Sequence, residues 1–556
     1  MSAPSRLDHR AEATPSTVVP RWVEWAFDRR RVWLLLSGVG LALSLGLVAA
    51  FGTDAGISYD EDVQRQYGEL VIAWYRSGFE DGRALSFSNL FYYGGLFDAL
   101  AQLIVALSPL DAFDTRHLLT CLTAVLGLVA TFQLAARIGG ARAGFFGALL
   151  LALTPVWLGH GLFNPKDIPF ATAAAFASVT ALNLALGPAP IRLRDACLAG
   201  VAAGVTLAVR PGGVFVLGYP CLALGLRLAL EVSRRQRDRV PLRVVRLAAN
   251  LVLCLSVLVL VAWPLMLSAW PWAQLEPLSR PLEGMRVARN FLFNAEMLWN
   301  GQTIRPNAAP LSYLPLWFNV TLPELYLVAL LAGLAVLARI VWKRDWQGER
   351  AIGCVLLASF VLVPLAAVFI SRPVVYDAHR HFLFLLPPLA AMGGLAFSEL
   401  LGAHWLPRMG RDAIAAATCA IAVAVAVDIV QLHPYQYAYF NRTSGGLRKQ
   451  YKRYETDYWG ISYREGIEWV VRELGPVDPA RRTRITGCDY NGNERLRYYR
   501  DRIPGARDKI DIVYSYANAD LQLGLRRWNC HRVPGKVVHV VFRHEAPLLY
   551  VRRTVR

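Results

Sequence analysis

Residues 56–64 read GISYDEDVQ and follow the first long apolar segment of the chain. Three consecutive carboxylates in this stretch, Asp60, Glu61 and Asp62, repel one another, which tends to raise the pKa of at least one of them and suits a general base or a cation site. The stretch also has a structural interpretation, because Ser58 and Glu61 fit a capping box at a helix start, where acids are favoured. A second acid, Asp167, favours the functional interpretation, since the topology predicted below brings it to the same side of the membrane.

The composition is that of a membrane protein. Of 556 residues, 55% are hydrophobic and only 18% are charged, and long apolar runs repeat almost from end to end, as is typical of a polytopic membrane protein. The formal net charge of +18 also fits a nucleic-acid-binding protein. However, many arginines fall in short loops between apolar segments, where the positive-inside rule accounts for them. We therefore expect membrane lipids around the chain and no nucleic-acid partner.

Apolar segments of about 20 residues, the length of one crossing, predict eleven transmembrane helices within a domain at 32–431. The polar tail 1–31 is expected to be cytoplasmic and the first helix to be a retained anchor, because no small-residue cleavage signature follows it. With this orientation every predicted cytoplasmic loop is basic, including six arginines between 234 and 246, as the positive-inside rule requires. The predicted helices lie near 32–51, 116–136, 144–162, 168–186, 196–210, 213–229, 247–268, 316–340, 351–370, 382–401 and 412–431.

The loop at 52–115 has the opposite charge, with ten acidic residues against three basic ones, and is expected outside. Its segment 91–110 is long and apolar enough to cross the membrane. A crossing would turn the arginine-rich loop outward and place Asp98 near mid-bilayer, at a cost of several kcal/mol. We therefore expect this loop to hold juxtamembrane helices on the outer surface. A second large outer loop, 269–315, is rich in Pro, Trp and Arg and is expected to cover a cavity with short helices and turns.

Beyond the last span the sequence predicts a small extracytoplasmic α/β domain at 432–556. Segments 484–486, 509–513 and 537–542 have the pattern of strands, and 466–474 that of a helix. Cys488 and Cys530 are the only two of the eight cysteines in this domain. In an oxidising compartment we expect them to form a disulfide; the alternative is two free buried thiols.

Ionisable residues gather near the outer ends of the predicted spans, while the predicted bilayer midplane is nearly free of charge. Asp167 opens the fourth span, Arg210 closes the fifth, and the run 379–381 (His-Arg-His) precedes the tenth. A transporter usually places ionisable residues or broken helices deep in its spans, so this pattern favours chemistry at the outer face. Acids there can serve a hydroxyl nucleophile and arginines can hold an anionic leaving group. The structural alternatives are snorkelling for Arg210, headgroup binding for 379–381 and helix capping for Asp167.

Short motifs along residues 32–430 resemble, in family order, the GT-C superfamily of integral-membrane glycosyltransferases. The resemblance is to the bacterial relatives of protein O-mannosyltransferases and of the aminoarabinose transferase that modifies lipid A. The fold that it implies is GT-C-like, a polytopic α-helical membrane protein with outer-face juxtamembrane helices. The motifs are Tyr59-Asp60-Glu61, Asp167 in an outer loop, AVRPGG at 208–213, Trp263-Pro264, Leu314-Pro315, Leu322-Pro323 and HRHFLFLLPP at 379–388.

The resemblance implies inverting transfer of a sugar from a polyprenyl-phosphate-linked donor to an acceptor hydroxyl, at the outer face of a bacterial inner membrane. It implies Asp60 as the catalytic base with Glu61 beside it, and Asp167 as a second acid that orients acceptor or base. The donor phosphate would be bound by Arg210, which stands where some relatives have Lys-Gly, and by Arg380 with its neighbours His379 and His381. Some family members use a divalent cation, and no His-rich set here decides whether this chain does.

The acceptor is open among a glycan, a lipid and a protein. Aromatic residues at 435–441 and 457–460 can stack on sugar rings but are also common at membrane interfaces, so the C-terminal domain receives no chemistry from the sequence. Two other functions compete with the cell-envelope glycosyltransferase: a lipid or polysaccharide transporter or flippase, and a non-catalytic membrane scaffold that carries the C-terminal domain.

Overall fold

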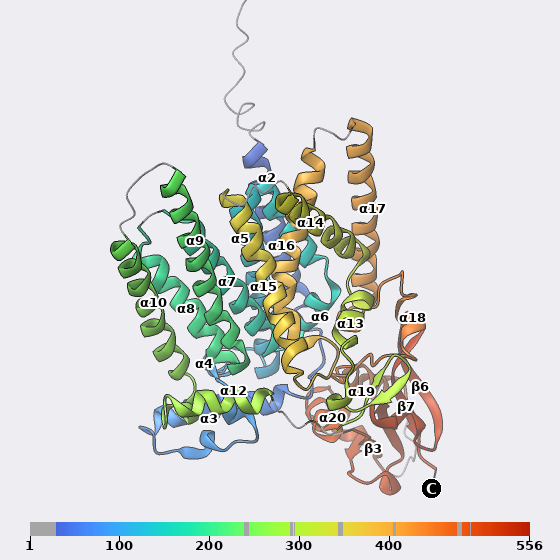
Figure 1. Ribbon diagram of the computed structural model, residues 1–556. Coiled ribbons are helices and arrows are strands. Elements are labelled where there is room, and N and C mark those ends of the chain that lie inside the picture. Colours follow the sequence, from blue (N-terminus) through green and yellow to red (C-terminus); the bar gives the residue numbers. More distant parts are fainter. Residues whose placement is uncertain are drawn as a thin grey trace, which may run out of the picture.

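Long apolar helices stand side by side, and short helices and a small sheet domain lie together at one end of them (Figure 1). The computed structural model describes residues 29–555 except 189, 238–243, 290–292, 294, 343–347, 404–406, 475–480 and 490. This arrangement confirms the predicted class, a polytopic helical protein with a small C-terminal α/β domain. The long or apolar helices are α2 (Arg29–Phe51), α5 (Ala112–Ala152), α6 (Pro155–Phe163), α7 (Asp167–Leu186), α8 (Leu193–Val209), α9 (Gly218–Arg237), α10 (Val244–Leu267), α13 (Tyr313–Thr321), α14 (Glu324–Trp342), α15 (Glu349–Ser371), α16 (Leu386–Gly402) and α17 (Arg408–Leu432).

Within the described residues, eight helices are long and apolar enough to cross a membrane, or nine if α13 and α14, which meet at 119°, form one broken span. Each of the eleven predicted ranges falls on helix, but α8, with 17 residues, and the short α6 do not meet that criterion alone. The number eleven stays a prediction.

One predicted span, 144–162, is interrupted in the structure. Its first part continues α5 beyond Gly140, whose φ of 77° is the left-handed conformation that glycine adopts without steric cost. Its second part is α6, which starts at Pro155 after the extended residue Thr154, as expected before a proline.

α7 is the central helix of the bundle. Of its most apolar 18-residue window, 83% is buried within the chain. Many of its residues are alanines, and small side chains let neighbouring helices approach closely. α5, α8, α9 and the 3-10 helix η5 (Arg380–Leu385) pack around it. The first residue of α7 is Asp167, so the most enclosed helix of the fold holds one of the predicted site acids.

The predicted outer loop 52–115 forms juxtamembrane elements that lie across the helix ends (Figure 1). They are α3 (Glu61–Arg76), η1 (Gly82–Leu85), η2 (Leu90–Tyr92) and α4 (Leu96–Val105). With ten residues, α4 is too short to span a bilayer. Its Asp98 pairs with the buried Arg116 of α5 at 2.5 Å. The second loop contributes α11 (Pro271–Gln274), α12 (Ser279–Arg289), the β1–β2 hairpin (Met297–Trp299 and Gln302–Ile304) and η4 (Pro306–Ala308). The 3-10 helix η3 (Pro211–Leu217) forms the connection between α8 and α9.

The C-terminal domain is a five-stranded sheet in the order β4-β3-β5-β7-β6. β3 is parallel to both neighbours, and β7 is antiparallel to both of its own. The strands are β3 (Thr483–Gly487), β4 (Ile510–Ile512), β5 (Leu521–Leu525), β6 (Lys536–Arg543) and β7 (Ala546–Arg553). The α-helices of the domain are α18 (Gly446–Gln450), α19 (Tyr463–Arg472), α20 (Gly492–Arg502) and α21 (Ala506–Lys509). Its 3-10 helices are η6 (Gln436–Ala438), η7 (Tyr516–Asn518) and η8 (Arg527–Arg532).

Candidate active site

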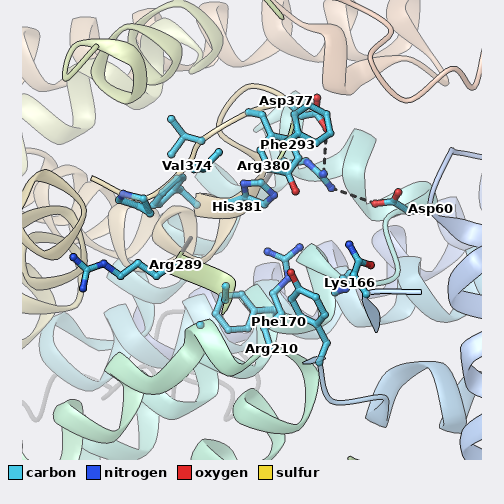
Figure 2. Close-up of a pocket in the computed structure, with 18 of the residues that line it drawn as sticks. Asp60, Lys166, Phe170, Arg210, Arg289, Phe293, Val374, Asp377, Arg380 and His381 are labelled. Carbon is cyan, nitrogen blue, oxygen red and sulfur yellow. Dashed lines mark ion pairs between the residues drawn. The ribbon is translucent and has the colours of Figure 1, made fainter. Parts of the chain in front are cut away.

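A cavity of about 880 Å³ lies where the helix ends, the juxtamembrane helices and the C-terminal domain meet. Figure 2 shows cationic and acidic side chains pointing into it from several elements. One part of the wall is apolar and comes from η3, α15 and η5. The charged side chains in its lining are Asp60, Lys166, Arg210, Arg289, Asp377, Arg380 and Arg527, with His381 beside them.

Arg380 connects the two acids that the sequence singled out. Its Nη1 lies 3.5 Å from Oδ2 of Asp60 and 3.5 Å from Oδ2 of Asp167. The carboxylate of Asp60 is 44% exposed toward the cavity, whereas that of Asp167 is 2% exposed. The accessible acid is therefore Asp60, and Asp167 is a buried counter-ion.

Asp60 occupies the N-cap position of α3, but its side chain makes no capping hydrogen bond. Glu61, the first residue of the helix, reaches back to the preceding turn: its Oε2 accepts a 2.6 Å bond from the backbone N–H of Ser58, and its Oε1 lies 2.7 Å from Nε2 of His117. This is one half of a capping box. Glu61 is buried and turned away from the cavity lining. The structural role at the helix start that the sequence suggested for this stretch therefore belongs to Glu61, whereas the side chain of Asp60 lines the cavity.

The turn before α7 fixes the position of Asp167. Asn164 accepts hydrogen bonds from the backbone N–H groups of Lys166 and Asp167, and its Nδ2 donates a 2.8 Å bond to the carboxylate of Asp167. The cap of this helix is thus supplied by Asn164. The carboxylate of Asp167 is oriented toward Arg210, whose Nη2 lies 2.5 Å from its Oδ1.

Arg210 and Arg380 both lie at the end of a helical segment beside the cavity. Arg210 follows the last residue of α8 with extended backbone before Pro211, and its side chain turns to Asp167 rather than to a lipid headgroup. Arg380 lies at the start of η5, with its guanidinium 4.5 Å from the ring centre of Trp459 and 5.1 Å from that of Tyr376. These rings hold the guanidinium plane by cation–π contact.

Lys166 is a cavity cation to which the sequence analysis assigned no role. Its Nζ lies 3.7 Å above the ring of Tyr93. Burial, followed by the charge of Arg210, lowers its pKa to about 8, so the amine is largely protonated at neutral pH. Its position next to Asp167 in the sequence was the feature that could have indicated its place in the site.

The histidines differ in their placement. His381 lines the cavity, whereas His379 does not and packs against Phe318, with ring centres 4.8 Å apart. Burial lowers the pKa of His379 to about 3, so its ring is neutral at physiological pH. A neutral ring outside the cavity offers a phosphate in the cavity no positive charge.

The C-terminal domain forms part of the site. Tyr458, Trp459, Asn491, Arg527 and Trp528 line the cavity. Sequence reasoning missed Arg527, which donates a 2.6 Å bond to Asp377, the residue that also holds Arg380 at 3.1 Å. Asp377 and Arg527 are 150 positions apart, and no local pattern indicated their contact. The aromatic residues at 457–460 were the only feature of the sequence that suggested a role for this domain in the site.

The same domain fixes the backbone before Asp60. The N–H of Ile57 donates a 2.6 Å bond to the hydroxyl of Tyr499. A Cβ on Gly56 would lie 2.1 Å from the carbonyl oxygen of Ile461, so only glycine permits this approach. The segment that ends in Asp60 is therefore clamped from both sides.

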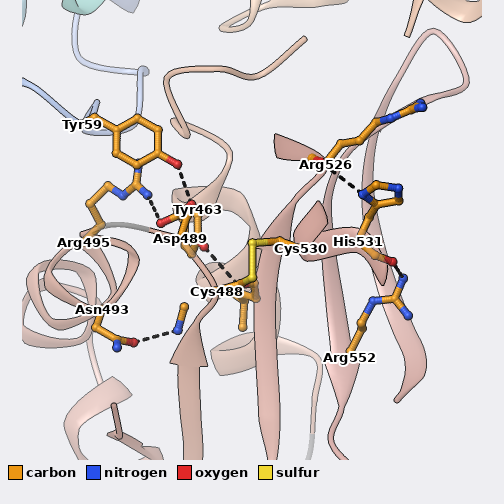
Figure 3. The surroundings of a disulfide bond; sticks show 12 residues. Tyr59, Tyr463, Cys488, Asp489, Asn493, Arg495, Arg526, Cys530, His531 and Arg552 are labelled. Atoms are coloured by element: carbon orange, nitrogen blue, oxygen red, sulfur yellow. Dashed lines mark hydrogen bonds and ion pairs between the residues drawn. A yellow bond between two sulfur atoms is a disulfide. The ribbon is translucent and has the colours of Figure 1, made fainter. Parts of the chain in front are cut away.

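The structure joins Cys488 to Cys530 by a disulfide, with an S–S distance of 2.03 Å (Figure 3). Cys488 follows β3 and Cys530 lies in η8. The bridge therefore attaches the loop that carries Arg527 and Trp528 to the centre of the sheet.

A divalent cation does not fit the acids of this cavity. In the part of the chain that the structure describes, no group of three His, Cys, Asp or Glu side chains is placed to hold a metal ion. The guanidinium of Arg380 already lies between Asp60 and Asp167.

No family model matches the sequence, and no curated protein matches it either. Among solved structures, the chain is similar to ArnT from Cupriavidus metallidurans bound to undecaprenyl phosphate, with a TM-score of 0.46 and 14% identity over 93% of this chain and 98% of that one. It is also similar to the oligosaccharyltransferase AglB from Archaeoglobus fulgidus in complex with an inhibitory peptide and a dolichol-phosphate. The TM-score is 0.45, with 12% identity over 88% of this chain and 69% of that one.

A third similar structure is the arabinosyltransferase EmbB from Mycobacterium smegmatis, with a TM-score of 0.39 and 16% identity over 77% of this chain but only 39% of that one. All three TM-scores lie below 0.5 and all three identities below 25%. The chemistry proposed for this chain therefore rests on its own site.

Proposed function

We propose that the chain is an integral-membrane glycosyltransferase that transfers a sugar from a polyprenyl-phosphate donor to an acceptor hydroxyl, with inversion at the anomeric carbon. The observation that carries the proposal is the contact between Asp60 and Arg380, because it places an accessible base beside a cation at the edge of one cavity. Transfer to a hydroxyl with a phosphate leaving group needs both.

The distribution of charge and apolar surface supports the donor class. Lys166, Arg210, Arg289, Arg380 and Arg527 bring five cationic side chains to the cavity lining, against the carboxylates of Asp60 and Asp377. This excess suits a phosphate. Apolar residues of η3 and α15, such as Val214 and Val368, line the same cavity, and α15 is one of the helices apolar enough to cross a membrane. An isoprenoid chain can follow that wall into the lipid.

In the proposed reaction the acceptor hydroxyl gives its proton to the carboxylate of Asp60 while its oxygen bonds to the anomeric carbon. The bond from that carbon to the phosphate oxygen breaks, and its electron pair stays on the phosphate. Arg380, Arg210 and Lys166 stabilise the charge that develops there. Asp167 touches neither reactant: it holds Arg210 and Arg380 in place and is a positioning residue.

The proposal includes an orientation. The C-terminal domain and the cavity would face the extracytoplasmic side of a bacterial inner membrane, and the tail before α2 would be cytoplasmic. The transporter alternative is less well supported, because the charged groups of the cavity gather at one end of the helices. Arg227 of α9 is buried, and it is bonded to the carbonyl oxygens of Leu184 and Pro188 at the end of α7 remote from Asp167.

The test is to incubate the purified chain with a panel of polyprenyl-phosphate sugars and to measure the release of polyprenyl phosphate by mass spectrometry. We expect release from at least one donor, and loss of that release in Asp60→Asn. Absence of release from every donor, together with transport of the intact lipid between leaflets of a proteoliposome, would contradict the proposal and support the transporter.

A further inference from the structure

A second cavity, of about 330 Å³, adjoins the first on the side of the C-terminal domain. The two cavities share Tyr458, Arg527 and Trp528 in their linings. The rest of the second lining comes from the segment around the β1–β2 hairpin, from 455–457, from the end of η8 and from Leu548. None of its lining residues belongs to a transmembrane helix, so this cavity is not a place for an isoprenoid chain.

The lining of the second cavity offers hydrogen-bond acceptors and donors together. Glu296 and Glu455 supply carboxylates, whereas Arg526, His531 and Arg532 supply N–H donors. Threonine hydroxyls at 303 and 456 do both. A sugar hydroxyl is itself a donor and an acceptor, so a mixed lining of this kind matches a carbohydrate. A third acid, Asp457, also lines this cavity, and the three acidic side chains disfavour a second phosphate.

Aromatic side chains stand at the boundary between the two cavities. Tyr458 and Trp528 line both, and the ring of Trp528 lies 5.5 Å from that of Tyr59, the neighbour of Asp60. Aromatic rings give sugar rings an apolar surface with a polar edge. A carbohydrate in the second cavity would thus meet a ring beside the proposed base.

A chain of charged contacts connects the second cavity to Asp60. Nε of Arg527 lies 3.6 Å from Glu455, while its Nη2 donates to Asp377 at 2.6 Å. Asp377 holds Arg380 at 3.1 Å, which contacts Asp60 at 3.5 Å. Arg527 is 4% exposed in its side chain. This nearly buried side chain lines both cavities.

The loop that forms the wall is held in an unusual conformation. Trp528 and Asn529 both have positive φ, at 53° and 59°, which costs energy for residues with a side chain and is often found where a ligand binds. The next residue, Cys530, is bonded to Cys488. The bridge thus anchors this loop to the segment that follows β3.

We propose that the second cavity binds a carbohydrate group of the acceptor and presents one of its hydroxyls to Asp60. This inference rests on the proposed function for the role of Asp60, but it makes a separate claim: the acceptor is a glycan or glycolipid, not a protein side chain. The donor enters from the membrane side and the acceptor from the side of the C-terminal domain, so the two meet at the boundary of the cavities.

A binding experiment tests the subsite without any transfer. The full chain in detergent is titrated by saturation-transfer NMR with methyl glycosides of hexoses, pentoses and amino sugars and their disaccharides. We expect at least one to bind, and Arg526→Ala to weaken it at least about tenfold, the effect of one hydrogen bond to a charged group. Thr303→Trp, which fills the cavity, should abolish binding.

The control is Glu545→Gln, in the exposed turn between β6 and β7, whose carboxylate is 67% exposed and pairs with Arg448. Its affinity for the saccharide should equal that of the wild type. If no saccharide of the panel binds to the wild type, or if Thr303→Trp binds as well as the wild type does, the subsite is overturned.

A kinetic experiment separates this inference from the proposed function. In transfer assays, Arg526→Ala should raise the KM for the saccharide acceptor at least about tenfold and leave the KM for the polyprenyl-phosphate sugar within twofold. A Ser/Thr-containing peptide accepted in place of every saccharide would overturn the subsite while leaving the transferase intact. A third outcome is possible: the wild type binds a saccharide, Thr303→Trp does not, and the wild type transfers sugar to no acceptor. This result would support the subsite and contradict the transferase.

Discussion

The hydroxyl of Tyr59 donates a 2.7 Å hydrogen bond to the carboxylate of Asp489, so the residue before the proposed base is held by the C-terminal domain. Arg495 pairs with the same carboxylate at 2.7 Å and lies 4.0 Å above the ring of Tyr59 (Figure 3). Burial raises the pKa of Asp489, against the effect of Arg495. Movement of this domain would displace Asp60, which makes the domain part of the site and not an appendage.

Asp60→Asn should abolish sugar transfer while leaving the fold intact. The amide keeps the size of the side chain but cannot accept a proton, and a positioned base contributes typically about 10²–10⁴-fold to the rate. Donor affinity should be largely preserved, since no cation is removed. The measurement is kcat with a saturating donor, beside a thermal midpoint equal to that of the wild type. Near-wild-type transfer by a folded variant would assign the base to another residue.

Arg380→Lys and Arg380→Ala should separate charge from geometry. Lysine keeps one positive charge but loses the planar fork that reaches Asp60, Asp167 and Asp377 together. We expect both variants to raise the donor KM and lower kcat. Alanine should be worse, because it removes one of the two arginines that pair with each of the buried carboxylates of Asp167 and Asp377. Donor binding by fluorescence with a labelled polyprenyl phosphate measures the first effect. Unchanged donor binding in Arg380→Ala would remove Arg380 from the phosphate site.

The sequence predicted those site residues that lie next to span ends. Asp60, Asp167, Arg210 and Arg380 were identified because hydropathy located the span ends and few charged residues stand there. The structure brings Asp60, Arg210 and Arg380 to one cavity and buries Asp167 against the two arginines. Glu61 could not be separated from Asp60 by composition. Only the hydrogen bonds of Glu61 to Ser58 and His117 show that its carboxylate faces away.

Long-range packing determined what the sequence did not predict. The C-terminal residues of the cavity, above all Arg527, reach it through sheet order and a disulfide rather than through a local pattern. The strands at 521–525 and 546–553 were also missed: β5 is a short LQLGL segment buried at every position, so it shows no alternation of polar and apolar residues. Hydropathy predicted where most helices lie, but it does not report a break such as the one at Thr154, which depends on local backbone chemistry.

Replacing both Cys488 and Cys530 by serine should destabilise the C-terminal domain. The bridge closes a separation of 42 residues, for which the loss of loop-closure entropy in the unfolded chain corresponds to about 3–4 kcal/mol. The lowered thermal midpoint is the first measurement. Non-reducing peptide mapping of the native protein is the second, and recovery of both thiols in alkylated form would refute the bridge.

The buried carboxyl of Glu455 should make stability depend on pH. Burial, the largest effect, raises its pKa from 4.5 to about 7; Arg527 opposes this shift and Asp377 adds to it. The folded chain therefore binds this proton more tightly than the unfolded chain. The stabilisation is complete below pH 4.5 and is lost as the pH rises to about 7.

The variant Glu455→Gln lacks this titration, so its stability relative to the wild type should increase between pH 4.5 and 7 and then level off. At about 1.4 kcal/mol per pKa unit, the difference amounts to at most about 3–4 kcal/mol. Thermal midpoints of both proteins from pH 4.5 to 8 give the comparison. Parallel midpoint curves would show that Glu455 ionises normally.

The final prediction concerns the side of the membrane on which the cavity lies. α9 ends at Arg237 at the end of the helices opposite to the sheet domain (Figure 1), and arginine-rich connections favour the cytoplasm. A cysteine introduced as Arg237→Cys, in a background whose free cysteines are replaced by serine, should resist a membrane-impermeant maleimide in intact spheroplasts and react after lysis. Residues 450–550 should be cleaved by external protease in the same cells. Labelling of position 237 from outside, together with protection of 450–550, would place the cavity in the cytoplasm. A donor on the outer leaflet would then be out of reach of Asp60, and the proposed reaction would have to use a cytoplasmic donor.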